Sequence, residues 1–172
     1  MGAASAPRPV KLIAGLLVSS LDLLGDVHAQ AAAAFGAIDL ASEPAAWTVT
    51  SYYRDEMGDS LWRQFLSFAT LVDPGRLVEV KRRTNEMEQR WRVEPGRRVN
   101  IDPGYAAPLK LVLATTKDAA HRVYLGQGIS AEVTLIWERG SYRACAHTYP
   151  DYADAGAIAF FNRVRTALKR GD

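Results

Sequence analysis

The sequence has a single cysteine, three histidines and no apolar run that approaches the length of a membrane-spanning helix. Because Cys145 cannot form an internal disulfide, the disulfide-stabilised secreted domains are excluded, and we expect a reducing, cytoplasmic environment. A spanning helix needs about 20 consecutive apolar residues, so no membrane partner is expected. The scattered histidines and the lone cysteine lack the spacing of a structural zinc site, and no metal is expected.

Three motifs of nucleotide-binding proteins and hydrolases are also missing. The chain has no G-x-x-x-x-G-K-[ST] phosphate loop, no G-x-G-x-x-G after a strand and no G-x-S-x-G elbow. Their absence argues against the P-loop NTPases, the Rossmann dinucleotide-binding enzymes and the α/β-hydrolases. With 21 basic and 19 acidic residues the net charge is only +2, which gives little support for a nucleic acid partner.

What is present is the composition of an ordinary soluble globular protein. At 172 residues, with 48% hydrophobic and 23% charged residues, the chain suits one domain with a sizeable core. Residues 1–9, MGAASAPRP, are predicted to be a disordered tail, so the single domain is expected to cover residues 10–172. The segment LIAGLLVSSLDLL resembles the apolar part of a signal peptide, but Asp22 and Asp26 interrupt it, and we expect a strand followed by a helix instead.

Hydrophobic periodicity predicts alternating strands and helices. VKLIAGLLV is the kind of short apolar run expected of a central strand. Ser19 with Asp22 three positions later has the pattern of a capping box, and Asp73-Pro74 combines an N-cap with a proline at the first helical position. The predicted strands are 10–18, 47–53, 61–72 and 110–116, followed by hairpins that turn at 126–128 and 138–142, and the predicted helices are 19–35, 73–91 and 152–169.

This order, β-α-β-β-α-β followed by a hairpin extension and a C-terminal helix, predicts an α+β fold. We expect a ferredoxin-like two-layer sandwich, in which helices cover one face of a mostly antiparallel sheet. Pro103-Gly104 is expected to form a turn before the strand at 110–116. The predicted buried stripe of helix 73–91 is Leu77, Val80, Thr84, Met87 and Trp91, and the charged residues that lie off it are Lys81, Arg82, Arg83 and Glu88.

One hairpin, LVLATTKDAAHRVYLGQGISAEVTL, concentrates hydroxyl and titratable groups. If Gly126-Gln127-Gly128 is a three-residue loop, Arg122 lies opposite Glu132. Alternation sends one set of side chains to a polar face, namely Arg122, Tyr124, Ser130, Glu132 and Thr134, and the other set to the core, namely Val123, Leu125, Ala131, Val133 and Leu135. A bulge before Lys117 would bring the polar groups of the preceding strand to the same surface.

This polar surface has the chemistry of an anion site. The cationic donors, which suit phosphate or carboxylate, are Lys110, Lys117 and Arg122, and the hydroxyl groups are Thr115, Thr116 and Thr134. His121 can exchange a proton near neutral pH, and Glu132 or Asp102 can act as a base or hold a cation. The alternative is a solvated sheet face joined by an Arg122–Glu132 ion pair that contributes under about 1 kcal/mol.

Two further segments carry candidate groups. TSYYRDEMG places Tyr52, Tyr53 and Glu56 at the predicted end of a strand, where loops often bind ligands, although aromatic side chains there can equally be partly buried. HTYPDY places Asp151 before the last helix, where capping of that helix is expected rather than catalysis.

The segments TSYYRDEMG, RRVNIDPGY, KLVLATTKDAAHRVYLGQGISAEVTL and TYPDY together resemble an uncharacterised bacterial and archaeal family of unknown function, some members of which are labelled GTP-binding proteins. The resemblance spans about Val10 to Arg165. Asp118 directly follows Lys117, which departs from the guanine-reading T-K-x-D spacing, so no GTPase mechanism is implied. The residues that the resemblance implies for a site are Tyr52, Tyr53, Glu56, Asn100, Asp102, Tyr105, Lys110, Thr115, Thr116, Lys117, His121, Arg122, Glu132, Thr134, Tyr149 and Asp151.

We therefore expect a protein that binds an anionic, phosphorylated or nucleotide-like small molecule on a polar sheet face, and that could also act on it as an enzyme. In this hypothesis Lys110, Lys117 and Arg122 hold the anion, and His121 serves as acid or base. The alternative is a noncatalytic RNA- or protein-binding module that uses the basic helix 73–91. A third interpretation, an assembly protein, would need an exposed apolar patch along LWRQFLSF.

Overall fold

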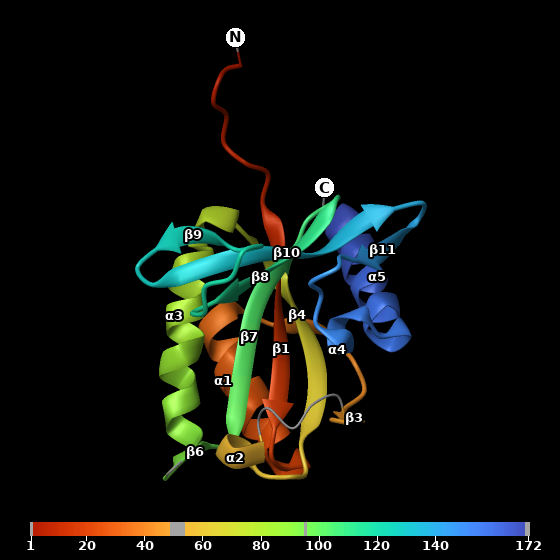
Figure 1. Cartoon of the computed structure of the whole chain (residues 1–172). Helices are drawn as coiled ribbons and strands as arrows, with labels where there is room; N and C mark the ends of the chain where they lie inside the picture. Colours follow the sequence, from red (N-terminus) through yellow and green to blue (C-terminus); the bar gives the residue numbers. More distant parts are fainter. Residues whose placement is uncertain (1, 49–53, 95, 171–172) are drawn as a thin grey trace.

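The computed structural model describes residues 2–48, 54–94 and 96–170 (Figure 1). Residues 2–9 precede the first strand, form no helix or strand, and have exposed side chains. The rest of the described chain combines helices with an antiparallel sheet, which confirms the α+β class. Extension of a single domain over residues 10–172 stays a prediction. The described residues contain no helix that is both long and apolar enough to span a bilayer.

Nine strands form one sheet, with the order β11-β10-β8-β7-β1-β4-β2, and β3 and β9 pair with β4 and β10 respectively. The strands of this sheet are β1 (Val10–Val18), β2 (Ile38–Ala41), β3 (Ala45–Ala46), β4 (Trp62–Val72), β7 (Val99–Ala106), β8 (Lys110–Thr115), β9 (Val123–Gly126), β10 (Ile129–Glu138) and β11 (Ser141–Ala144). A small separate hairpin consists of β5 (Arg92–Val93) and β6 (Gly96–Arg97). All of these pairings are antiparallel.

The helices lie on both faces of the sheet. They are α1 (Leu24–Phe35), α2 (Arg54–Met57), α3 (Leu77–Glu88), α4 (Pro150–Ala153) and α5 (Ala155–Arg170), and short 3₁₀ turns precede α1 and α3 and follow α3. One face of β1, including Leu12, packs against α1 and α3. The opposite face, including Ile13, packs against α5, as Figure 1 shows. The predicted two-layer arrangement is therefore wrong for the last helix, because the apolar stripe of α5 covers the second face of the sheet.

Most of the predicted elements are present. The strands predicted at 10–18, 61–72 and 110–116 are confirmed within about two residues at each end. The helices predicted at 19–35 and 73–91 are confirmed to the same extent when the 3₁₀ turns that flank α1 and α3 are counted with them. The last helix is broken in two, since α4 and α5 meet at Asp154. Asp151 does not cap this helix but lies buried inside α4.

The second strand of the sheet is not the one predicted at 47–53. β2 occupies this place beside β4, and Trp47 and Thr48 belong to no strand. The remainder of the predicted strand, residues 49–53, lies outside the described residues. The four residues of β2 are too few for periodicity to reveal, although their burial alternates as expected of a strand.

The sheet splits between β7 and β8, and this split positions the candidate site. The two strands pair only over Gly104–Ala106 and Leu111–Leu113, after which β8 turns away from the direction of β7 (Figure 1). Where β8 has turned away, one edge of β7 has no neighbouring strand, and we call it the released edge. Its backbone amide and carbonyl groups need other hydrogen-bond partners when they are buried. Helix α3 supplies them, because Glu88 accepts a hydrogen bond from the Ile101 amide at 2.7 Å and Lys81 donates one to the Ile101 carbonyl at 3.2 Å. Both side chains were predicted to be solvated, but both are buried.

The predicted turn at Pro103-Gly104 is also wrong, because both residues lie inside β7. The amide of Ile101 points away from β1, toward the released edge. Alternate residues of a strand point their N–H and C=O groups to the same edge, so the nitrogen of Pro103 also faces the released edge. A proline there removes no hydrogen bond from the sheet, as is usual for prolines at strand edges.

The hairpin of β9 and β10 differs from the predicted one in its loop. Gln127 and Gly128 form a two-residue turn with φ values of 52° and 76°, and a bulge follows between Ile129 and Ser130. Beyond the bulge, Val123 pairs with Ala131. Val123 and Leu125 are nevertheless 67% and 43% exposed, so their predicted place in the core is wrong. β9 pairs with β10 alone, beside the main path of the sheet.

Gly104 should tolerate no side chain, because it lies where β7 and β8 come together. A Cβ atom at this position would lie 2.2 Å from the carbonyl oxygen of Val112. We expect Gly104→Ala to lower the free energy of unfolding by about 1–3 kcal/mol, measured by chemical denaturation. The matched control is Gly25→Ala in α1, where a Cβ meets nothing within 4 Å and alanine should stabilise the helix by up to about 1 kcal/mol. Equal stabilities of the two variants would contradict this account of the split.

Candidate functional site

A pocket of about 550 Å³ lies at the split of the sheet. Its walls come from β4, α3, β6, β7, β8, β10 and the segment around α4, so it gathers residues that are far apart in the sequence. The basic residues that line it are Arg63, Lys81, Arg97 and Lys117, and the acidic residues are Glu88, Asp102, Glu132 and Asp151. Amide and hydroxyl groups complete the lining, namely Asn85, Gln89, Asn100, Thr115, Thr116, Tyr149 and Tyr152.

Asp102 lies between two cations. Its Oδ1 is 3.8 Å from Nζ of Lys81, and its Oδ2 is 3.8 Å from Nη1 of Arg63. Asn100, two residues earlier on the same face of β7, donates a hydrogen bond to Asp102 Oδ2 at 2.8 Å. The Asp102 side chain is 28% exposed, so it is the most exposed of these three charged groups, all of which line the pocket.

Arg63 also forms an ion pair on its other side. Its Nη2 lies 2.7 Å from Oδ2 of Asp151, and its guanidinium carbon lies 4.9 Å from the centre of a Trp47 ring. Burial raises the pKa of the Asp151 carboxyl, and the charge of Arg63 opposes this effect. The pair thus links β4 to α4 at the side of the pocket.

Glu88 joins helix α3 to the hairpin that follows it. Its carboxylate contacts Nη1 of Arg97 and accepts the hydrogen bond from Ile101. Burial raises the pKa of Glu88, while the charges of Lys81 and Arg97 lower it in part. Nε of Arg97 lies 2.9 Å from the carboxylate of Glu56. Glu56 therefore contacts a residue of the pocket lining but does not itself line the pocket.

Arg122 holds three segments together beside the pocket. Its Nε donates to Glu132 at 2.8 Å, its Nη1 donates to the Lys117 carbonyl at 3.0 Å, and its Nη2 donates to the Tyr149 hydroxyl at 2.7 Å. These partners lie after β8, in β10 and just before α4. The predicted pairing of Arg122 with Glu132 is confirmed, but it is a buried pair and not a solvated one, since the side chains are 7% and 1% exposed.

His121 shares the carboxylate of Glu132. Its Nε2 lies 3.2 Å from Glu132, and its ring stacks on His147 with 4.2 Å between the ring centres. Thr134, fully buried, donates its hydroxyl to the same carboxylate at 3.2 Å. Among the described residues, no group of three or more histidine, cysteine or acidic side chains could hold a metal ion.

A comparison with protein-family models matches residues 8–167 to a domain of unknown function, DUF4416. The chain belongs to the DUF4416 family. This confirms the resemblance that its sequence motifs indicate. No curated protein and no solved structure matches the chain significantly. For this DUF4416 protein, the chemistry of the site therefore has to be argued from its own geometry.

The structure brings together about half of the residues that the sequence indicates. In the DUF4416 protein, the predicted residues that line the pocket are Asp102, Thr115, Thr116, Lys117 and Glu132, together with Asn100, Tyr149 and Asp151 from the family resemblance. His121, Arg122 and Thr134 contact Glu132 but do not line the pocket.

The other predicted residues lie elsewhere. Lys110 is exposed at the opposite end of β8, beside Ile136. Tyr105 belongs to the other face of β7, where it packs beside Val112, and burial raises its pKa. Tyr52 and Tyr53 lie outside the described residues.

Sequence reasoning missed four charged residues of the pocket, namely Arg63, Lys81, Glu88 and Arg97. The signal for Arg63 was that it is the single charged residue of β4, a strand whose other residues are mostly apolar. Lys81 and Glu88 are seven residues apart, and two helical turns bring them to the same side of α3. That spacing could have been noticed, but only the released edge of β7 explains why these charges are buried.

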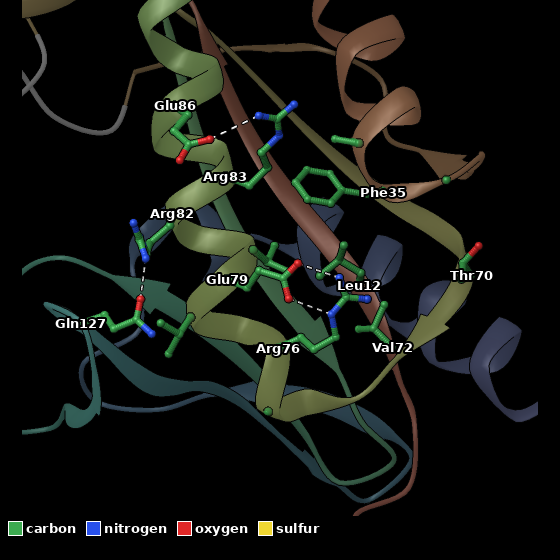
Figure 2. A pocket seen from close by; sticks show the side chains of 15 residues that line it. Leu12, Phe35, Thr70, Val72, Arg76, Glu79, Arg82, Arg83, Glu86 and Gln127 are labelled. Carbon is green, nitrogen blue, oxygen red and sulfur yellow. Dashed lines mark hydrogen bonds and ion pairs between the residues drawn. The ribbon is translucent and has the colours of Figure 1, made fainter.

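A larger hollow, of about 830 Å³, lies between α1 and α3 (Figure 2). It is lined by exposed charged side chains over an apolar base. As Figure 2 shows, these charges are satisfied locally, in the pairs Arg76–Glu79, Arg83–Glu86 and Arg82–Gln127. Exposed pairs of this kind contribute little and select no ligand, so we place the candidate site in the DUF4416 protein at the split of the sheet.

Breaking the buried Arg122–Glu132 pair should be costly. Arg122→Ala leaves the Glu132 carboxylate buried without its arginine, and we expect the free energy of unfolding to fall by about 3–5 kcal/mol. Glu132→Gln added to Arg122→Ala should recover part of this loss, because the double variant buries no unpaired charge. Strictly additive losses, measured by chemical denaturation of all three variants, would show that the two side chains are not coupled.

Glu88→Gln should change how stability depends on pH. Because the folded-state pKa of Glu88 is raised, the protonated form is favoured by folding, and wild-type stability is lost as pH rises from 4.5 through the folded pKa. Glutamine resembles the protonated acid, so Glu88→Gln should match the wild type at low pH and become relatively more stable above this window. Urea denaturation at several pH values tests this, with Glu86→Gln on the exposed side of α3 as the control for loss of a carboxylate. A wild type that gains stability relative to Glu88→Gln as pH rises would contradict the prediction.

Proposed function

We propose that this protein binds an anionic, phosphorylated or nucleotide-like small molecule in the pocket between β7 and β8. The observation that carries the proposal is the convergence of basic side chains from separate segments, Arg63 from β4, Lys81 from α3, Arg97 from β6 and Lys117 after β8. Guanidinium and ammonium groups are the usual protein donors to phosphate and carboxylate oxygens.

The equal number of acidic residues does not cancel this attraction. Glu132 is matched by Arg122, which lies outside the lining. Glu88 and Asp151 are each paired with one arginine of the lining, Arg97 and Arg63 respectively, which leaves Lys81 and Lys117 to be set against Asp102. Asp102 is the remaining carboxylate, and it lies at the longer distance of 3.8 Å from each of its two cations. A ligand anion can therefore approach the same cations without first breaking a short ion pair of Asp102.

The size and the neutral lining of the pocket also support a small molecule. Pockets for drug-sized ligands have volumes of about 300–1,000 Å³, and this one has about 550 Å³. Thr115, Thr116, Asn85 and Asn100 add groups that can both donate and accept hydrogen bonds. Such groups suit the hydroxyls of a sugar or the polar edge of a base.

If the protein acts on its ligand, Asp102 is the best candidate for an acid or base. It is the exposed carboxylate of the pocket and touches both Lys81 and Arg63. His121 contacts Glu132 outside the lining, so its geometry supports a role in holding that carboxylate. The proposal therefore concerns binding, and no reaction is assigned.

The alternative of an RNA- or protein-binding module on helix 73–91 has weaker support. Lys81 points into the pocket, and the other basic residues of this helix that line the hollow of Figure 2 are paired with glutamate or glutamine. A nucleic acid site would need unpaired basic side chains interleaved with exposed aromatic rings. We do not favour this function.

We also infer that residues 10–106 form a ferredoxin-like unit. Its support is the strand order β7-β1-β4-β2, in which β1, α1, β2, β4, α3 and β7 follow one another along the chain with antiparallel neighbours throughout. The hairpins after β7 then extend this unit at one edge. The lone Cys145 is the support for a cytoplasmic location.

Ligand screening with a matched pair of lysine variants tests the proposed function. Inorganic phosphate, sugar phosphates and nucleotides should raise the unfolding temperature, because they bind the native state only. Lys117→Ala should lower the affinity for the tightest-binding of these ligands at least tenfold, as expected for loss of about 1.5–3 kcal/mol from a charge-assisted hydrogen bond. Lys110→Ala removes the same charge at the far end of β8 and should leave affinity unchanged. Equal effects of the two variants, or no binding by any of the compounds, would refute the site.

A further inference from the structure

A second hollow, of about 450 Å³, adjoins the polar pocket. The two cavities share four lining residues, Trp47, Arg63, Pro150 and Asp151. The second hollow, called here the apolar hollow, lies between β3, β4 and the start of α5. The apolar hollow therefore adjoins the candidate site at the side chains of these shared residues.

The apolar hollow differs from the polar pocket in its lining. About half of the residues that line it are apolar or aromatic, including Ala45 and Ala46 from β3, Phe65 from β4, and Ala157 and Phe160 from α5, and the others are polar or charged. The rings of Phe65 and Phe160 stack with 6.2 Å between their centres. Charged side chains lie among these walls only as a minority, so the hollow suits an apolar or aromatic group.

Two of the residues that both cavities share, Arg63 and Asp151, form an ion pair. Arg63 and Asp151 meet at 2.7 Å across the boundary, and both side chains are less than a tenth exposed. The guanidinium of Arg63 lies 5.7 Å from the centre of the Phe65 ring, on the side of the apolar hollow, and 3.8 Å from Asp102, on the side of the polar pocket. Among the described residues that line the two cavities, Arg63 is the one basic side chain that lines both.

We infer that the two cavities are parts of a single elongated binding site, and that its ligand is a phosphate ester with an apolar or aromatic end group. The phosphate lies in the polar pocket near Arg63 and Lys117, and the end group lies in the apolar hollow. This inference rests on the proposed function. Ligand sites usually combine apolar walls with a few polar groups that orient the ligand; here the polar pocket supplies the charged and hydroxyl groups, and the apolar hollow supplies most of the aromatic and aliphatic side chains.

A ligand series with a constant head group tests the inference. Isothermal titration calorimetry with the wild type should give phenyl phosphate at least tenfold tighter binding than inorganic phosphate. If both bind equally, the apolar hollow takes no part of the ligand and the inference is wrong, while the proposed function stands. If neither binds, the proposed function fails and this inference fails with it.

Filling the apolar hollow should remove the advantage of the phenyl group. Ala45 pairs with Arg63 across β3 and β4, and paired residues project to the same face of a sheet, so a phenylalanine at this position enters the hollow. With Ala45→Phe, phenyl phosphate should bind no more tightly than inorganic phosphate, whose affinity should be unchanged. Ala33→Phe, on an exposed position of α1 outside the three cavities, should keep the tenfold difference. A tenfold advantage that survives in Ala45→Phe would overturn the inference.

Discussion

The released edge of β7 determines the architecture of the candidate site. A buried backbone amide and carbonyl cannot remain without partners, and at Ile101 the neighbouring strand has already turned away. Helix α3 takes the place of that strand by inserting one acidic and one basic side chain. Once these charges are buried they need partners of their own, which explains the succession of ionic groups that runs through the pocket.

This succession connects elements that lie far apart in the sequence. Arg97 reaches Glu88, Lys81 and Arg63 both approach Asp102, and Arg63 continues to Asp151. Beside the pocket, Arg122 similarly connects the loop after β8 with the residue before α4. Hydrogen bonds and ion pairs are directional, so a polar network of this extent holds the strands and helices that carry it in defined relative positions. A binding site needs its side chains held in this way.

The sequence could predict the parts of the fold that are long and periodic. β1 and β4 are nine and eleven residues long, with few interruptions, and α3 has an unambiguous proline start. β2 was missed because four residues carry too little pattern, and the layer of α5 was misplaced because periodicity does not say which face of a sheet a helix will cover. The turn predicted at Pro103 was wrong because proline usually indicates a turn, whereas here it lies at a strand edge where no neighbouring strand requires an N–H donor.

The candidate site was predictable where its chemistry is concentrated in sequence. Thr115, Thr116, Lys117 and Glu132 lie in one hairpin, so a local pattern could reveal them. Arg63 and Lys81 could not be found in this way, because isolated charges in amphipathic elements are normally solvated, and only the pairing of distant strands brings these two together.

The short register between β7 and β8 has a mechanical consequence. Since only Gly104–Ala106 ties the two strands, the angle at which they diverge is governed by the side chains wedged between them and not by a continuous ladder of main-chain bonds. Helix α3 contributes Lys81, Asn85 and Glu88 to the lining of the pocket between these strands, so the packing of α3 against β7 helps to set the width of the cavity.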